Sequence, residues 1–379
     1  MKTQISFWER ETYFRDIDVV IAGSGIVGLN AALHLKKRAP MLNILVAERG
    51  PLPSGASTKN AGFACFGSVT ELADDLTRMS EHEVFTLVEK RFLGLQRLRA
   101  NIGDANIRFY QWGGHEIFDD EASYEACAEH IHDFNHRLKP ILGIDLVYKN
   151  ADSDIQRFGF ENVKHIILNT AEGQIDTGRM MQALIKKVSD AGIHILNGLH
   201  ITAIENESNG LSLQTEQGFS ILTRKLLICT NGFAKQFLPE EDVEPARAQV
   251  LVTAPIENLK IRGTFHYDKG YYYFRNIGER VLFGGGRNLD FKTENTTDHA
   301  LTPLVQEKLE ELLRTMILPG TDFTIEQRWS GTMGVGATKN PIVKKVRENI
   351  FCAVRMGGMG VALGSLTGEE AAELVLSEA

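Results

Sequence analysis

The first fifty residues alternate between strand-like and helix-like patterns of apolar and polar positions. Residues 19–22 are a short apolar run, residues 26–35 carry apolar side chains three or four positions apart, and a second apolar run ends at Glu48. A buried parallel strand gives a continuous apolar run, whereas a helix packed on a sheet gives the wider spacing. Pro40 lies where such a helix has to end. The pattern therefore predicts a β-α-β unit.

Similar patterns recur toward the C-terminus. Residues 180–191 predict an amphipathic helix, which strands over residues 194–204 and 225–230 follow. Residues 350–354 predict a strand that a glycine turn joins to a terminal helix. Both regions have the pattern of a layered α/β fold.

The remaining segments have a different character. Residues 70–103 are largely helical in pattern. Period-two alternation, which is typical of an antiparallel sheet, occurs over residues 107–118, 250–254, 270–276 and 280–286. These segments predict a second domain.

The composition is typical of a soluble globular protein with about two domains. The chain has 379 residues, of which 43% are hydrophobic and 24% charged. The formal net charge is −8 without a block of Lys or Arg, which argues against a nucleic-acid partner. No run of about 18 apolar residues is present and the N-terminus lacks the apolar core of a signal peptide, so we expect a cytoplasmic protein without a membrane span. The four cysteines form no C-x-x-C pair and the 11 histidines are scattered, so we expect no metal site.

Three glycines mark the junction of the first strand and helix. Gly23, Gly25 and Gly28 form G-x-G-x-x-G, in which the first permits a tight turn, the second lets a pyrophosphate approach the backbone, and the third lets the helix touch the strand. The helix N-terminus then faces the phosphates. Glu48 lies 20 residues beyond Gly28, where its carboxylate would accept the ribose hydroxyls. The motif predicts dinucleotide binding without separating NAD from FAD.

Two further segments point to FAD. After Glu48 the chain reads RGPLPSGASTKNAGFACFGS, a loop of small and polar residues whose backbone can run beside an extended cofactor. Near the other end, Gly357, Gly358 and Gly360 precede the terminal helix and aim a second helix start at a ligand. Beside the N1–C2=O edge of a flavin, such a start stabilises the negative charge of the reduced ring. These glycines are also compatible with simple packing of the terminal helix on the sheet.

Together these segments resemble the D-amino-acid-oxidase-like (DAO) family of FAD-dependent oxidoreductases, which includes glycine and sarcosine oxidases and γ-glutamylputrescine oxidoreductase. The resemblance covers nearly the whole chain. It rests on AGSGIVGLNAALHL with Glu48, GASTKNAGF, DTGRMMQALIKKVSDAGIHILNGLHITAIE followed by KLLICTNGFA, PARAQV, and RWSGTMGVGATKNPIV followed by MGGMGVALGSLTG. The first and last motifs are specific to the family, whereas the middle stretch is generic to the fold.

The resemblance implies an α/β fold with a discontinuous Rossmann-type FAD-binding domain and an inserted α+β substrate-binding domain on a mixed or antiparallel sheet. The FAD-binding domain would comprise residues 1–75, 165–240 and 325–379, and the substrate-binding domain residues 75–165 and 240–325. FAD would be noncovalent, because Gly331 stands where sarcosine oxidases carry the tethering cysteine. The motifs and the resemblance together assign these residues to FAD: Gly23, Gly25, Ile26, Val27, Gly28, Glu48, Arg49, Ala56, Ser57, Thr58, Lys59, Asn60, Ala61, Gly62, Ile204, Thr230, Asn231, Gly232, Gly331, Arg355, Gly357, Gly358, Met359, Gly360 and Val361.

The resemblance also implies the chemistry. Family members transfer a hydride from the carbon beside a neutral amine nitrogen to flavin N5, and the resulting imine hydrolyses. The partners would be a small amine or amino acid and oxygen or another electron acceptor. Tyr271, Tyr273 and Arg275 share one face of a predicted strand, so they either line a pocket over the flavin or fill the sheet core.

One departure from the family pattern concerns substrate binding. The arginine that grips the substrate carboxylate in the amino-acid oxidases is replaced here by Met333. Arg355 stands where relatives usually carry glycine and is the candidate for an anionic group of the substrate, with a surface salt bridge or phosphate contact as the alternative. Lys59 is a second candidate. The lysine that sarcosine oxidases use toward oxygen falls near Leu282, which leaves oxidase or dehydrogenase open.

The leading hypothesis is therefore an FAD-dependent amine or amino-acid oxidoreductase. A non-enzymatic FAD-binding protein that has lost turnover and an NAD-dependent dehydrogenase are the alternatives.

Overall fold

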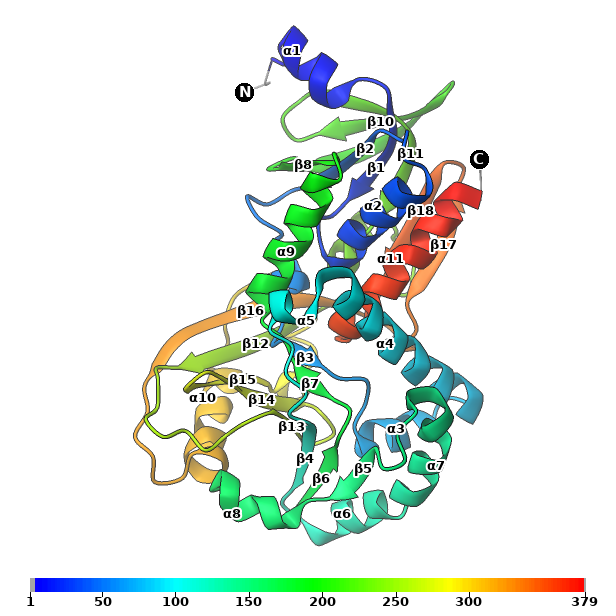
Figure 1. Cartoon of the computed structure of the whole chain (residues 1–379). Helices are drawn as coiled ribbons and strands as arrows, with labels where there is room; N and C mark the ends of the chain where they lie inside the picture. Colours follow the sequence, from blue (N-terminus) through cyan, green and yellow to red (C-terminus); the bar gives the residue numbers. More distant parts are fainter. Residues whose placement is uncertain (1–3, 378–379) are drawn as a thin grey trace.

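The computed structural model describes residues 4–377, which form two bodies that lie one above the other in Figure 1. Within the described chain each body is built on an eight-stranded sheet, and a two-stranded sheet made of β3 (Phe63–Ala64) and β7 (Gly173–Gln174) lies near their junction. Residues 1–3 and 378–379 of the predicted cofactor-binding ranges lie outside the described residues. The architecture is the predicted fold class, an α/β body joined to a body with a mixed, mainly antiparallel sheet.

The first sheet is parallel at its centre. Its strand order is β17-β18-β11-β1-β2-β8, and in this path only the β17–β18 pair is antiparallel. An antiparallel hairpin of β9 and β10 continues from β11. The strands are β1 (Ile17–Ala22), β2 (Ile44–Glu48), β8 (His194–Asn197), β9 (Ile201–Glu207), β10 (Gly210–Thr215), β11 (Ser220–Ile228), β17 (Ile342–Arg347) and β18 (Ile350–Val354).

Helices pack on this sheet through closely fitting glycines. The helices are α2 (Ile26–Arg38), α4 (Glu81–Ile102), α5 (Asp104–Ile107), α9 (Thr177–Asp190) and α11 (Gly360–Ser377). Gly364 and Gly368 of α11 lie directly on α2, because a side chain at 368 would come within 2.6 Å of the Val27 carbonyl oxygen. A side chain at Gly28 would overlap the carbonyl oxygen of Gly23, so only glycine lets α2 approach β1 this closely.

The second sheet carries the other body. Its strand order is β16-β12-β15-β14-β13-β4-β6-β5, in which only β13 and β4 run parallel. The strands are β4 (Gly114–Phe118), β5 (Tyr148–Asn150), β6 (His165–Asn169), β12 (Glu244–Thr253), β13 (Thr264–Tyr267), β14 (Tyr272–Ile277), β15 (Arg280–Gly285) and β16 (Ile325–Val335).

Two helical layers cover this sheet. α8 (Ile155–Phe158) and α10 (Pro303–Leu312) contribute to one apolar core, which contains Phe265 and Phe274. A separate core forms beneath the helices α3 (Val69–Leu76), α6 (Glu121–Ala128) and α7 (Ile131–Leu142) together with the first part of α4. Short helical segments complete the described chain: α1 (Phe7–Glu9), η1 (Arg10–Phe14), η2 (Ala56–Thr58), η3 (Asp152–Asp154), η4 (Asn231–Gln236), η5 (Arg287–Leu289) and η6 (Leu313–Ile317).

Two predicted boundaries fall on strands of the second sheet. The predicted domain boundaries at residues 165 and 325 coincide with the first residues of β6 and β16. Both strands pair within the second sheet, β6 with β4 and β16 with β12. β16 continues to Val335 and thereby carries the second sheet to the junction with the first body (Figure 1). The domain ranges themselves stay a prediction.

The local patterns predicted most elements, with two corrections. The expected helical region over 70–103 is α3 and α4, and the strand over 350–354 is β18. The single strand expected over 194–204 is instead two strands, because Gly198 has a φ of 73° and turns the chain between them. The strand expected over 107–118 begins only at Gly114, since Arg108 and Gly113 both have positive φ.

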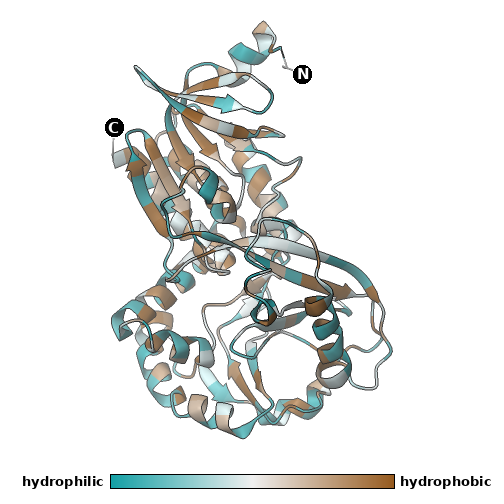
Figure 2. Cartoon of the chain, turned by 180° about the vertical axis from the view of Figure 1, so that it is seen from behind, coloured by the Kyte–Doolittle hydropathy of each residue, from teal (hydrophilic) through white to brown (hydrophobic). Residues whose placement is uncertain are grey.

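Hydropathy follows this layering. Figure 2 shows apolar residues concentrated on the strands of the first sheet, with hydrophilic positions on the outward faces of the helices. No helix within residues 4–377 combines the length and the apolar character that crossing a bilayer requires.

Candidate functional site

A cavity of about 620 Å³ lies where the two bodies meet. The carboxyl ends of four parallel strands open into it through Ala22, Glu48, Cys229 and Ala353. In open α/β sheets, ligands bind outside the carboxyl ends of the strands. The cavity continues to the second sheet, whose Tyr273 also lines it. One continuous cavity therefore joins the predicted cofactor end to the predicted substrate end.

The cofactor end contains the first glycine turn. Gly23 has a φ of 108° and sits at the turn, while Gly25 and the start of α2 line the cavity. The Ile26 amide donates to Ser57 Oγ at 3.0 Å, which ties the loop after β2 to the helix start. Backbone N–H groups of the first turn of a helix bind anions, so this end suits a pyrophosphate.

Glu48 lies on the cavity wall at the end of β2. Its Oε2 accepts from the Ser24 hydroxyl at 2.8 Å and its Oε1 from the Ser54 hydroxyl at 2.9 Å and from the Gly50 amide at 3.0 Å. These bonds fix the carboxylate in place. A ribose hydroxyl at Oε1 would share or replace the contact with Ser54.

The far part of this end is aromatic and basic. Arg49 places its guanidinium 3.7 Å from the centre of the Phe233 ring, and both residues line the cavity. The chain near β9 reaches the cavity through His200 and Ile201. Ile204, the predicted contact, does not line it and instead packs at the edge of the core of the first sheet.

The loop over residues 54–62 forms one wall and is held to α9 and to β16. Asn60 Oδ1 accepts from the Gly62 amide at 2.9 Å and from Thr177 Oγ1 at 2.8 Å, which fastens the loop to α9. Trp329 Nε1 donates to the Lys59 carbonyl at 3.0 Å and fastens it to β16. Thr58 does not line the cavity, because its hydroxyl donates to the Pro53 carbonyl at 2.6 Å. These bonds make the loop a fixed surface.

The C-terminal glycine turn forms the opposite wall. Residues 356–362, including the start of α11, line the cavity. The amides of Arg355 and Met356 donate to Asn231 Oδ1 at 3.1 and 3.2 Å, which positions the turn. Two helix starts, those of α2 and α11, thus face one cavity, as the sequence predicted.

Arg355 itself is directed away from the cavity. Its guanidinium donates to Asp242 Oδ2 at 2.6 Å, to the Asn340 carbonyl at 2.9 Å and to Thr338 Oγ1 at 2.9 Å. All of these partners lie outside the lining, and so does Arg355. This placement corresponds to the salt-bridge alternative, and we do not propose a substrate role for Arg355.

The predicted strand face divides in a similar way. Tyr271 and Tyr273 line the cavity, and burial raises the pKa of Tyr273 to about 12. Arg275 lies behind the loop wall, where its Nε donates to the Ala61 carbonyl and its Nη1 to the Asn276 carbonyl. Arg275 therefore supports the loop instead of facing a ligand.

The structure brings most of the predicted residues to one cavity. Those that line it are Gly23, Gly25, Ile26, Val27, Glu48, Arg49, Ala56, Ser57, Lys59, Asn60, Ala61, Gly62, Thr230, Asn231, Tyr271, Tyr273, Gly331, Gly357, Gly358, Met359, Gly360 and Val361. Those outside the lining are Gly28, Thr58, Ile204, Gly232, Arg275 and Arg355. Gly28 and Gly232 serve close packing, since a side chain at either would overlap a backbone carbonyl. The functional roles of all these residues stay predictions.

The substrate end contains charged residues that the sequence analysis did not single out. Glu71, His266, Arg287 and Lys339 all line the cavity. Burial alone would raise the pKa of Glu71, but Arg91 and Lys339 beside it lower that pKa to about 2. No local motif marks these residues, because they come from four separate segments.

Arg287 is another cation on the wall of this end. Its Nε is buried without a hydrogen-bond partner, and its guanidinium carbon lies 4.9 Å from the centre of the Phe291 ring. Burial lowers its pKa. An arginine on a cavity wall with free N–H donors is suited to binding a carboxylate.

The fold and the site together are those of a dinucleotide-binding protein in which two bodies line one cavity. Residues 18–374 match the family model described as FAD dependent oxidoreductase (DAO), and the chain belongs to this family. It is therefore an FAD-dependent oxidoreductase, which sets aside the NAD-dependent alternative.

Individual proteins give the same picture. The probable oxidoreductase OrdL of Rhizobium meliloti (strain 1021) is 24% identical over 96% of this chain and 84% of its own length. The gamma-glutamylputrescine oxidoreductase of Escherichia coli (strain K12) is 21% identical over 96% of this chain and 84% of its own length. Glycine oxidase from Geobacillus kaustophilus superposes with a TM-score of 0.76 at 20% identity, covering 96% of this chain and 95% of that one. This last likeness shows the fold.

The residues present fit FAD. Gly25 lines the cavity, and its φ of −73° and ψ of −179° suit any residue, so backbone conformation does not require glycine here. A side chain at 25 would come within 2.9 Å of Ser57 Oγ and would narrow the cavity at the start of α2. The two facing helix starts suit the pyrophosphate and the electron-rich edge of a reduced flavin.

Proposed function

We propose that this enzyme oxidises a C–N bond of a small amine that also carries a carboxylate. When bound, FAD takes up the hydride from the carbon next to the amine nitrogen, and the imine product hydrolyses in water. The observation that carries the substrate class is the unpaired guanidinium of Arg287 on the wall of the substrate end. Glycine and γ-glutamylputrescine, which appear in the names of two similar proteins, are both amines with a carboxylate, and this supports the proposal.

The chain's own residues would bind and orient the substrate. Arg287 would donate two parallel hydrogen bonds to the carboxylate, in place of the arginine that Met333 replaces. Tyr273 and Phe63, whose rings meet edge to face with centroids 5.7 Å apart, would form an apolar wall beside the reacting carbon. Both aromatic residues help to exclude water from that position.

The same geometry supports noncovalent FAD. Cys65 and Cys229 line the cavity, but burial raises the pKa of both thiols far above neutral. The thiolate is the reactive form, so neither cysteine is poised to attach a flavin. The Cys65 thiol donates instead to Met359 Sδ at 3.8 Å.

The test is anaerobic reduction of the bound flavin, followed by its absorbance. The panel pairs each amino acid with the amine that lacks its carboxylate, such as proline with pyrrolidine and sarcosine with dimethylamine. We expect bleaching by members of the carboxylate series. Absence of bleaching across the whole panel would refute C–N oxidation. Equal rates of flavin reduction by both members of every pair would refute the proposal that the substrate carries a carboxylate.

The matched variants are Arg287→Gln and Arg262→Gln. Loss of a charge-assisted bidentate contact costs about 1.5–3 kcal/mol, so Arg287→Gln should raise the KM for the carboxylate substrate by about 10- to 150-fold. The same variant should change the KM for the amine that lacks the carboxylate by no more than about threefold. Arg262 stacks on Trp112, with 4.5 Å to the ring centre, outside the cavity lining, and serves as the control.

Whether oxygen or another acceptor reoxidises the flavin is tested by mixing the reduced enzyme with air-saturated buffer. The predicted position of the oxygen-reactive lysine falls near Leu282, whose apolar side chain packs with Ala61 and Val252. We propose slow reoxidation by oxygen and faster reoxidation by a quinone or dye. Rapid reoxidation in air would assign an oxidase.

A further inference from the structure

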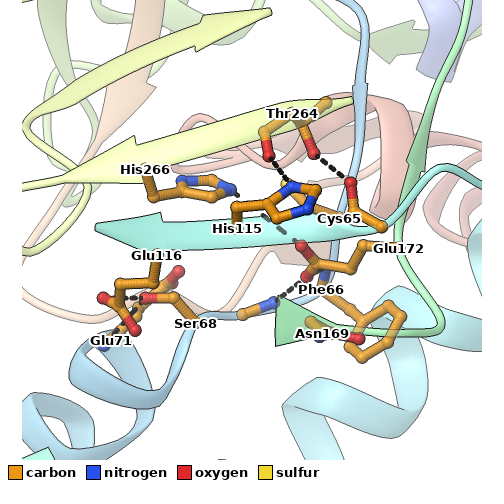
Figure 3. Close-up of polar contacts among 12 residues, drawn as sticks. Cys65, Phe66, Ser68, Glu71, His115, Glu116, Asn169, Glu172, Thr264 and His266 are labelled. Carbon is orange, nitrogen blue, oxygen red and sulfur yellow. Dashed lines mark hydrogen bonds and ion pairs between the residues drawn. The ribbon is translucent and has the colours of Figure 1, made fainter. Parts of the chain in front are cut away.

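A second, small cavity lies directly behind the wall of the substrate end. Its volume is about 10 Å³, room for a single water molecule. His266 lines both cavities and separates them. Figure 3 shows the polar residues that gather around it. The polar lining of the small cavity comprises Ser68, Glu116, Tyr148, Asn169, Glu172 and His266.

Glu172 is held at one side of this small cavity. Its Oε1 accepts from the amides of Phe66 at 2.8 Å and Gly67 at 3.1 Å. Its Oε2 lies 4.0 Å from His266 Nε2 (Figure 3). A side chain at Gly114 would overlap Oε2, so the fold keeps that position clear for the carboxyl group.

The other polar groups are arranged to hold a water. Asn169 is 3% exposed, its Oδ1 accepts from the Ala171 amide at 3.0 Å, and its buried Nδ2 has no partner. A water molecule in a small polar cavity needs two to four such partners. Glu172 and His266 are 4.0 Å apart, too far for a direct hydrogen bond, and a water molecule in the small cavity would bridge them.

The two ring nitrogens of His266 have different neighbours. Nε2 is directed to Glu172, whereas Nδ1 lies near Gly270, which is part of the wall of the main cavity, since a side chain at Gly270 would come within 4.0 Å of Nδ1. The Phe63 ring packs edge to face on the imidazole with centroids 5.2 Å apart. The imidazole therefore connects the substrate end with the buried carboxyl group.

We propose that His266, one water molecule and Glu172 form a path that takes the proton from the ammonium group of the bound substrate. The inference deepens the proposed function and rests on it. The N–H bond of the ammonium breaks as His266 Nδ1 gains that proton, the proton of Nε2 passes to the water, and a proton of the water passes to Glu172 Oε2. These steps transfer protons only, and no group is oxidised or reduced. The substrate becomes the neutral amine that C–N oxidation requires, and the carboxylate becomes a carboxylic acid.

The electrostatics agree with these roles. Burial raises the pKa of Glu172 to about 8, against the two amide hydrogen bonds that lower it. Burial lowers the pKa of His266 to about 4, so the imidazole passes the proton on without keeping it. A base works best when its pKa lies near the working pH.

The charged and titratable groups around the pair come from every neighbouring element. They are Cys65, Glu71, Arg91, His115, Glu116, Tyr148, Lys269 and Lys339. Glu71 is neutralised by Lys339, at 3.0 Å, and by Arg91, at 3.1 Å. Glu116 accepts hydrogen bonds from Ser68 and Thr70, and burial raises its pKa. Glu116 also lies opposite His266 across the β13–β4 pair, but both of its oxygens accept from Ser68 or Thr70. Glu172 differs because its Oε2 is directed to His266 Nε2 at 4.0 Å.

The first measurement is an infrared titration of the FAD-loaded enzyme between about pH 6 and 10. We expect a protonated-carboxyl band that disappears with a midpoint near 8 and is absent from Glu172→Gln. Glutamine keeps an oxygen that can accept from Phe66 and Gly67, so the fold should survive, as circular dichroism and flavin content will show. Absence of such a band in the wild-type protein overturns the inference, whether or not a substrate has been found.

The second measurement is the pH dependence of flavin reduction by the best substrate of the panel. The wild-type kcat/KM should rise to a plateau with an apparent pKa near 8. In Glu172→Gln and His266→Gln it should keep rising about tenfold per pH unit toward the pKa of the amine, so that the variants are slower at pH 7 and converge with the wild type at pH 10.

His115→Gln is the matched control. His115 is also a histidine of the second sheet whose pKa burial lowers to about 4, but its Nδ1 contacts the Thr264 carbonyl at 3.1 Å and it lines neither cavity. It should keep the wild-type pH profile. Identical profiles for wild type and Glu172→Gln refute the proton path alone, whereas a flavin that no amine reduces refutes the proposed function.

Discussion

Replacing Gly25 or Gly28 of the first turn by valine should impair different properties of the protein, FAD binding in the first case and folding stability in the second. Gly25 has backbone angles that any residue adopts, and an added side chain there would meet the Ser57 hydroxyl at 2.9 Å, a movable group. Gly28 has no such freedom, since a side chain would overlap the Gly23 carbonyl oxygen. Gly25→Val therefore occupies the space of the ligand, and Gly28→Val separates helix from strand.

The expected magnitudes follow from these contacts. If the pyrophosphate lies beside Gly25, a side chain at 25 would block about two backbone hydrogen bonds at about 1.5–3 kcal/mol each and would weaken FAD binding by roughly 10²- to 10⁴-fold. Overpacking at 28 costs about 1–3 kcal/mol or more of folding stability. Gly25→Val apoprotein should thus melt close to wild-type apoprotein, and Gly28→Val apoprotein well below it.

The assay is titration of each apoprotein with FAD, followed by flavin fluorescence, together with thermal melting of the same samples. Wild-type FAD affinity in Gly25→Val would show that the phosphates do not pass this glycine. Melting of Gly25→Val as low as Gly28→Val would show that Gly25 serves packing, and the cofactor argument would then be wrong.

Four further outcomes are expected. Acid precipitation should release the yellow flavin into the supernatant, and colour in the pellet would reveal a covalent link. Arg247→Met leaves Glu294 buried without its partner at 2.7 Å, which costs about 3–5 kcal/mol in urea unfolding, and a double variant with Glu294→Leu should recover most of this. Arg355→Ala should lower the Tm while the ratio of KM values for paired substrates with and without a carboxylate stays constant. Glu172 has a folded pKa of about 8, above its unfolded value, so its stabilising contribution is lost as pH rises from about 5 to 8, and the corresponding fall in the free energy of unfolding should be absent from Glu172→Gln.

The cofactor end could be predicted from the sequence because its signals are local. The turn at Gly23, the start of α2 and the end of β2 follow one another within residues 17–48, and the chain order alone brings them together. Backbone groups and glycines form much of the cavity wall there, so a motif contains most of the predicted cofactor-binding residues. The terminal turn before α11 is a second local signal of the same kind.

The substrate end could not be predicted in this way. Arg355 and Arg287 are both arginines next to glycine turns, and only the tertiary fold shows that Asp242 binds the first while the second stays free. Glu172 and His266 lie 94 positions apart and meet across two different elements. Neither pair has a spacing that a pattern can detect.

This difference between the two ends explains why membership of the family identifies the cofactor but not the substrate. We expect that replacing Gly25 weakens FAD binding and lowers activity with it, so that end should tolerate few changes. The substrate end is built from side chains on separate loops and strands, such as Arg287 after β15 and Lys339 after β16, and each can change without disturbing the cofactor. Met333 and Arg287 both line the cavity, and we propose that such a change has moved the anchor for the substrate carboxylate from position 333 to Arg287 while the cofactor end has stayed in place.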